Sequence, residues 1–268
     1  MASLKDNHAF AFTGKIGNVS AFTMRGYDKI FLRGKGGASK RKIKTSKKFE
    51  VTRQLNNEWK GVTLVSAVIR QALHALKPLA DYNISGPMNA LVKKIQSLDD
   101  INPKGQRAIF LSRRPELFSS FNYNQNTIFD SIVRQPLSFD LNKSDGTCEV
   151  RVPTLQPGIN LFPHPRFSYC RIVLSLAAVN DYFWNAELRN YFSKNPQSSM
   201  VPEIYTPWMQ TNKVEQTSVY HLALNSALAG GTEILMLLGV GVQYGIPSAD
   251  GSIQPAPYVG AAKIIGSL

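Results

Sequence analysis

The sequence predicts an α+β protein in three successive parts: a basic N-terminal β-hairpin and arm over residues 1–45, a helical segment over 46–104, and a β-rich, antiparallel, sandwich-like domain over 105–268. Two patterns support this order. In the second part apolar residues recur every three or four positions, as in amphipathic helices. In the third part they form short runs that Pro, Gly, Asn and Asp separate, as in antiparallel sandwiches.

The N-terminal part has the pattern of a small hairpin-like unit. Phe10 and Phe12 alternate with small residues, and Gly14–Asn18 has the composition of a turn. Two short strands are expected after this turn, at Val19–Arg25 and Lys29–Arg33. The following residues, 34–48, contain almost no apolar side chains and are expected to form a flexible basic arm or loop.

The helical part is expected to begin near Ser46, a residue that commonly caps helices, and to end at Pro78. Its apolar residues form one stripe: Val51, Leu55, Trp59, Val62, Val65, Ile69, Leu73 and Leu76. Gly61 interrupts this stripe at a cost of about 1 kcal/mol relative to Ala, so a division into two helices is an alternative. A second helix is expected from Ser85, with Pro87 in its first turn. It is expected to bury Met88, Leu91, Val92, Ile95 and Leu98.

Seven strands are expected in the third part, because extended apolar runs alternate there with turn residues. They are Ala108–Leu111, Thr127–Val133, Cys148–Val152, Phe167–Leu176, Ser218–Leu224, Thr232–Tyr244 and Tyr258–Ile265. By apolar density Thr232–Tyr244 could instead be a helix. Gly239, Gly241 and Gly245 favour a strand with bends.

The opening of the chain resembles a known group of sequences. The segment Gly14-Lys-Ile-Gly-Asn-Val-Ser-Ala-Phe-Thr-Met-Arg-Gly26, the strand Lys29–Arg33 and the helix containing Lys48-Phe49 and Gln54 carry the resemblance. Together they resemble an uncharacterised Bacteroidota protein family that opens with a GKxGNV hairpin, a basic strand and a helix. Related openings occur in small proteins encoded among phage structural genes. The resemblance covers about residues 12–60 and implies a β-rich second half and a structural role, but no site residues. The Lys-Thr-Ser-Lys-Lys segment departs from the Pro-Thr-x-Ala-Gln common in the family.

Positive charge is concentrated at the start of the chain. The whole chain has a net charge of +13, and residues 1–60 contribute +10 of it, from 14 Lys and Arg against 4 acidic residues. Six cations lie close together: Lys40, Arg41, Lys42, Lys44, Lys47 and Lys48. Residues 35–48 could therefore bind nucleic acid or another polyanion without sequence preference, by releasing condensed counterions. A solvated loop, or an arm that pairs with a neighbouring copy, are the alternatives.

No pattern of catalytic, metal-binding or cofactor-binding residues is recognisable. Gly34-Lys-Gly-Gly37 followed by Ser39-Lys40 lacks the spacing of a phosphate-binding loop. His8, His74, His164 and His221 are scattered and lack metal-ligand spacing. We therefore expect no metal and no cofactor.

Other reactive or aromatic residues have a structural interpretation. Cys148 and Cys170 are expected to be buried and reduced, with one disulfide as the alternative. Asp99 and Asp100 are expected to mark a solvent-facing turn. The aromatic residues Tyr182, Phe183, Trp184, Tyr191 and Phe192 favour a core, with a carbohydrate or peptide platform as the alternative.

These observations favour a non-enzymatic structural protein that forms homo-oligomers in a particle, filament or appendage-like complex. Phe10, Phe12, Phe22 and Phe31 are the candidates for assembly contacts, because a small hairpin unit cannot bury them by itself. The alternative is a cytoplasmic, sequence-nonspecific nucleic-acid-binding protein. Neither a signal peptide nor a membrane span is recognisable, which leaves the cytoplasm or a virus-like or extracellular assembly as locations.

Overall fold

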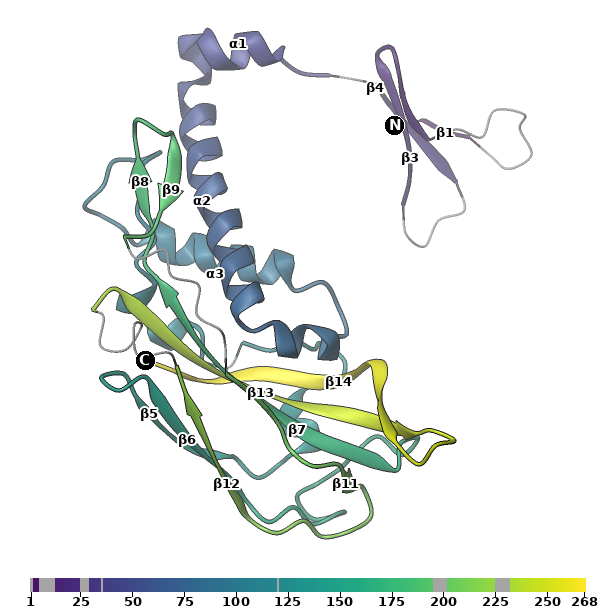
Figure 1. The fold of residues 1–268 in the computed structure, drawn as a ribbon. Helices are drawn as coiled ribbons and strands as arrows, with labels where there is room; N and C mark the ends of the chain where they lie inside the picture. Colours follow the sequence, from purple (N-terminus) through teal and green to yellow (C-terminus); the bar gives the residue numbers. More distant parts are fainter. Residues whose placement is uncertain are drawn as a thin grey trace. The chain divides into compact units, whose positions relative to one another are not determined.

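The structure is a computed structural model that describes residues 2–4, 13–24, 29–34, 36–119, 121–194, 202–224 and 232–268 (Figure 1). The fold is α+β, as predicted. The chain divides into two compact units, residues 1–53 and residues 54–268.

The first unit contains a four-stranded antiparallel sheet of order β1-β4-β3-β2. Its strands are β1 (Ala2–Leu4), β2 (Gly14–Ile16), β3 (Val19–Thr23) and β4 (Ile30–Gly34). A two-residue turn joins β2 and β3, because Ile16 pairs directly with Val19. Gly17 occupies the first turn position with φ +55°, which favours glycine because it has no Cβ. The predicted hairpin is therefore present, with Gly14–Ile16 as a strand and not part of the turn.

Residues 40–49 are helical, so the expectation of a flexible arm over 34–48 was wrong for this stretch. Helix α1 (Lys40–Thr45) is followed by the short 3-10 helix η1 (Lys47–Phe49) and by α2 (Glu50–Ala72). The Oγ of Ser39 accepts a hydrogen bond from the backbone N–H of Lys42 at 3.3 Å and caps α1. A side-chain cap together with Lys and Arg, which favour helices, outweighs the low apolar content of the segment.

The second unit has three layers, and helices cover one face of its central sheet (Figure 1). The central sheet has the order β10-β7-β13-β14, and β11 also pairs with β7. A second sheet, β12-β6-β5, packs on the other face. The strands of both sheets are β5 (Ser138–Asn142), β6 (Thr147–Val152), β7 (Tyr169–Asn180), β10 (Glu203–Tyr205), β11 (Met209–Gln210), β12 (Ser218–Ala223), β13 (Ile234–Pro247) and β14 (Ile253–Ser267).

Alternation along β7 separates two cores. Ile172, Leu174 and Leu176 lie in the core between the two sheets, and Val173 and Ala177 lie in the core under the helices. Successive side chains of a strand point to opposite faces, so a strand that is buried on both faces has an almost continuous apolar sequence. The helical layer consists of α2, the 3-10 helix η2 (His74–Leu79) and α3 (Ser85–Ser97).

Glycines in β13 allow η2 to lie directly on the sheet. A Cβ at Gly239 would be 2.4 Å from Leu76 Cδ1, and a Cβ at Gly241 would be 2.4 Å from Leu79 Cδ1. The strand also shows register shifts next to Gly239 and Gly245. The prediction of a strand with bends at these glycines is confirmed, and their close contact with η2 is an additional reason for their presence.

Two predicted strands were wrong. Residues 108–111 make one isolated bridge, between Ile109 and Tyr182, and then enter the 3-10 helix η3 (Leu111–Arg113). Residues 127–133 contain the helix α4 (Phe129–Ile132). Short apolar runs do not distinguish a strand from a helical turn. Phe129 and Ile132 are three residues apart, so one turn of helix buries both.

Helix α2 continues through Gly61, so the alternative of two separate helices is not adopted. A glycine at this position leaves room for the Tyr191 ring. A Cβ at Gly61 would lie 2.6 Å from Tyr191 Cε2. Tyr191 belongs to the hairpin of β8 (Phe183–Asn185) and β9 (Asn190–Phe192). Another short helix in the described residues is the 3-10 helix η4 (Pro115–Leu117).

Not every residue of the predicted stripe is buried. From Val62 onwards the stripe lies in the core, whereas Val51, Leu55 and Trp59 retain exposed fractions of 54%, 45% and 49%. In α3 Met88, Val92 and Ile95 are buried, but Leu98, the residue after the helix, is 48% exposed, contrary to the prediction. No helix in the described residues is long and apolar enough to cross a membrane.

Candidate functional site

The six clustered cations all face solvent. Lys40, Arg41, Lys42 and Lys44 lie on α1, Lys47 and Lys48 lie on η1, and every one of them is exposed. Helix α1 has no buried residue. Among the described residues no carboxylate forms a salt bridge with any of the six, so their charge is not neutralised there. An exposed, uncompensated group of cations attracts anions.

Arg53 holds α1 against the beginning of α2. Its Nη1 donates hydrogen bonds to the backbone oxygens of Ile43 at 2.9 Å and Ser46 at 2.8 Å. A guanidinium is well suited to this position because cations stabilise the carbonyl end of a helix. The basic segment therefore has a defined conformation at its junction with α2.

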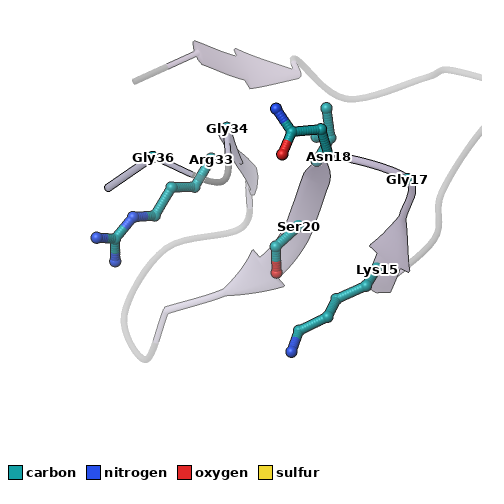
Figure 2. Close-up of a pocket in the computed structure, with 8 residues that line it drawn as sticks. Lys15, Gly17, Asn18, Ser20, Arg33, Gly34 and Gly36 are labelled. Atoms are coloured by element: carbon teal, nitrogen blue, oxygen red, sulfur yellow. The ribbon is translucent and has the colours of Figure 1, made fainter. Parts of the chain in front are cut away.

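The sheet of the first unit carries a second group of polar residues, which sequence inspection missed. Lys15 on β2 pairs directly with Ser20 on β3, and Ser20 pairs directly with Arg33 on β4. Residues paired across neighbouring strands point to the same face. The three side chains therefore form one row, here called the basic row, with the Ser20 hydroxyl between two cations (Figure 2).

The basic row borders a hollow of about 290 Å³. The other residues that line it are Gly17, Asn18, Val19, Gly34 and Gly36. Nothing lies within 4 Å of the position of a Cβ at Gly17, Gly34 or Gly36, so the backbone there is open to a ligand. Two strand spacings place the backbone positions of Lys15 and Arg33 about 10 Å apart, on either side of Ser20.

Phe22 and Phe31 occupy the next row of the same face. They are directly paired on β3 and β4, the two central strands, and each is two residues from a member of the basic row. Their rings stack at a centroid distance of 5.9 Å and an interplanar angle of 26°, and both remain half-buried. Of the residues predicted to mediate assembly, these two are brought together. Phe10 and Phe12 lie outside the described residues.

A buried carboxylate in the second unit has a structural role. Glu58 is 1% exposed, and its Oε2 lies 2.6 Å from Lys93 Nζ while its Oε1 accepts the N–H of Gly105 at 2.8 Å. Burial raises the pKa of Glu58, but the bonds from Lys93 and Gly105 outweigh burial, so the pKa lies below its ordinary value. The carboxylate stays ionised and joins α2, α3 and the loop at Gly105.

The prediction of a solvent-facing turn was wrong for Asp99, because this residue is buried. Its Oδ1 accepts the N–H groups of Ile101 and Asn102, and its Oδ2 accepts the N–H of Ala108 at 2.6 Å. Burial raises the pKa of Asp99, and these hydrogen bonds lower it further than burial raises it. Asp100 is exposed, as predicted. Asp99 therefore holds its loop together, whereas Asp100 faces solvent.

The described histidines make separate contacts. The Nδ1 of His74 lies 3.1 Å from Glu203 Oε1, and the Nδ1 of His221 lies 3.8 Å from Glu149 Oε2. The Nδ1 of His164 accepts the N–H of Arg166. His8 lies outside the described residues. Across the described residues no three His, Cys, Asp or Glu side chains are grouped so as to hold a metal ion.

Cys148 and Cys170 are buried and unpaired, as predicted. Both belong to the core between the two sheets. Burial raises the pKa of each thiol to about 12, so neither is a reactive thiolate near neutral pH.

The aromatic residues of the β8–β9 region mainly serve the core, as favoured. Tyr191 is buried, and Tyr182 and Trp184 pack against the core under the helices. The Tyr191 hydroxyl donates to the backbone oxygen of Arg107 at 2.7 Å and accepts from Gln96 Nε2 at 2.9 Å. The Tyr191 hydroxyl is therefore hydrogen-bonded to other residues of the chain on both its donor and its acceptor side.

Comparisons with protein families, curated proteins and solved structures gave no match to this chain.

Proposed function

We propose that the protein binds nucleic acid without sequence preference and does so through its basic N-terminal unit. The observation that carries this proposal is the exposure of all six cations on α1 and η1 without a described carboxylate partner. Each phosphate that such a cation neutralises releases condensed counterions, which favours binding.

Charge distribution supports a polyanionic ligand over an ordinary acidic protein surface. Residues 1–53 contain 13 Lys and Arg against 3 acidic residues, a net charge of +10, whereas residues 54–268 have a net charge of +3. A regularly charged polymer can contact many of these cations at once. Six phosphate contacts correspond to a slope of about −4 to −5 in log affinity against log salt concentration.

We propose binding and not catalysis, because three charged groups of the second unit, Glu58, Asp99 and Arg171, are engaged within the chain. The carboxylates of Glu58 and Asp99 are held by backbone and side-chain donors. The guanidinium of Arg171 lies over the rings of both Tyr205 and Trp208 and donates to Gln243 Oε1.

The test replaces Lys40, Arg41, Lys42, Lys44, Lys47 and Lys48 by Gln in the full chain. We expect weaker binding to every oligonucleotide sequence, and a salt slope reduced by about 4 to 5. The readout is fluorescence anisotropy with labelled oligonucleotides between 50 and 200 mM salt.

A matched control removes the same charge from the second unit. Lys60, Lys77, Lys94, Lys104, Arg166 and Lys213 are also exposed, and the control replaces these six by Gln. Their removal should change the slope far less. Equal losses in both variants, or tight binding that is sequence-selective and insensitive to salt, would contradict the proposal.

A second candidate function is homo-oligomeric assembly in a particle, filament or appendage-like complex. Leu55 and Trp59 on α2 favour it, since they lie one turn apart and remain 45% and 49% exposed. Large exposed apolar side chains on one helix face are typical of protein contacts. In a twofold antiparallel contact between two copies, Leu55 of each copy would pack on Trp59 of the other, and the contact would be closed by symmetry.

A further inference from the structure

We infer that the sheet face formed by the basic row and the Phe22–Phe31 pair binds single-stranded nucleic acid in preference to duplex. A phosphate would sit in the hollow beside Lys15, Ser20 and Arg33, and an unpaired base would stack on the phenylalanines. This inference rests on the proposed function and specifies which form of nucleic acid the N-terminal unit selects.

The first argument is the placement of the aromatic residues. Phe22 and Phe31 lie side by side on the two central strands of a four-stranded antiparallel sheet, on the face that carries the basic row. Sheets that bind single-stranded RNA use aromatic residues on their open face to stack two or three bases. Stacking of this kind tolerates any sequence, because every base has a flat face.

The second argument is the distance between the two rows. The basic row and the Phe22–Phe31 pair are two residues apart along each strand, which is about 7 Å. A phosphate and a neighbouring base of one strand can therefore engage both rows together. In a duplex the flat faces of the bases are covered by their neighbours, so the duplex could use the cations but not the rings.

The third argument is the chemistry of the hollow. Two cations flank a hydroxyl, and the two cations are not paired with any described carboxylate (Figure 2). An anion placed between two cations is attracted by both of them. The Ser20 hydroxyl can donate one hydrogen bond to such an anion, and the backbone of Gly17, Gly34 and Gly36 lines the same hollow.

The test uses the full chain with Phe22→Leu and Phe31→Leu together. Leucine retains apolar volume in the sheet but removes the aromatic face. We expect affinity for a single-stranded oligothymidine to fall at least about fivefold for each base that stacks. Affinity for a duplex of equal length should stay within about twofold of the unaltered protein.

A second variant, Lys15→Gln with Arg33→Gln, removes exposed side chains whose loss does not disturb packing. Its salt slope with the single strand should fall by about 1.4, the value for two lost phosphate contacts. Lys77→Gln with Lys94→Gln is the matched control from the second unit and should leave that slope unchanged. Amide resonances of Gly34 and Gly36 should shift when the oligothymidine is added to the unaltered protein.

The outcomes distinguish a failure of this inference from a failure of the proposed function. If the unaltered protein binds neither single strands nor duplex, the proposed function fails. If it binds both equally, or if the phenylalanine variant loses both equally, nucleic-acid binding stands and the preference for single strands is overturned. If neither variant changes single-strand binding, the sheet face is not the site.

Discussion

At the scale of single residues, glycines and buried carboxylates determine how the second unit packs. Gly61 is an example in which the contact outweighs helix propensity. Alanine would favour the helix by about 1 kcal/mol, but its Cβ would lie within 2.6 to 2.7 Å of three Tyr191 ring atoms. The ring cannot move freely, because its hydroxyl bonds both Gln96 and Arg107.

We predict that Gly61→Ala lowers the free energy of unfolding by about 1–3 kcal/mol, the range for overpacked cores. The matched control is Gly86→Ala in α3, where nothing lies within 4 Å of the added Cβ. That variant should be neutral or slightly more stable. Urea unfolding followed by circular dichroism measures both. Equal stability of the two variants would show that the Tyr191 contact does not constrain Gly61.

At the scale of elements, α2 has two regions with different surroundings. Its C-terminal part buries Val62, Val65 and Ile69, whereas Leu55 and Trp59 continue the apolar face without cover from the described residues. An amphipathic pattern predicts a face that prefers burial, but it does not say which surface covers that face. A second copy is the covering surface in the assembly proposal.

We predict that Leu55→Gln reduces the oligomeric state of the protein and leaves its stability nearly unchanged, since surface substitutions usually alter stability by less than about 0.5 kcal/mol. Light scattering coupled to size exclusion measures the mass, and thermal unfolding measures the stability. Thr52→Gln, a change on the same helix at an exposed polar residue, is the control. An unchanged mass for Leu55→Gln at all protein concentrations, or a monomeric unaltered protein, would exclude this contact.

At the scale of the whole molecule, most of the net charge and the hydrophobic cores lie in different units of the chain. The first unit carries most of the net charge and no large buried side chain among its described residues, whereas the second contains both hydrophobic cores. A domain of over 200 residues can bury enough surface to fold without the first unit. Binding and stability should therefore be separable.

We predict that deletion of residues 1–45 leaves a cooperatively folded protein that no longer binds nucleic acid. Its unfolding temperature should change by less than about 3 °C, which corresponds to about 1 kcal/mol for a domain of this size. Calorimetry and anisotropy measure the two properties, and light scattering on the same sample measures assembly. Retained binding would refute the proposed function, and a lost oligomer would place the assembly contact in the deleted residues.

Sequence by itself determined the α+β class, the strands β6, β7, β12, β13 and β14, the helix α3 and the exposed basic segment. Each of these elements follows from local composition or from the spacing of apolar residues along the chain. Both are properties of residues that are neighbours in sequence. It also indicated the two central strands of the N-terminal sheet.

Only the tertiary structure decided which residues meet across the chain. Lys15 and Arg33 are 18 positions apart, and strand register alone places them on either side of Ser20. In the same way, Gly61 meets Tyr191 and Gly239 meets Leu76 through contacts between distant segments. Propensity describes one residue and its neighbours, whereas register and close packing are properties of pairs of elements, so no local pattern could predict them.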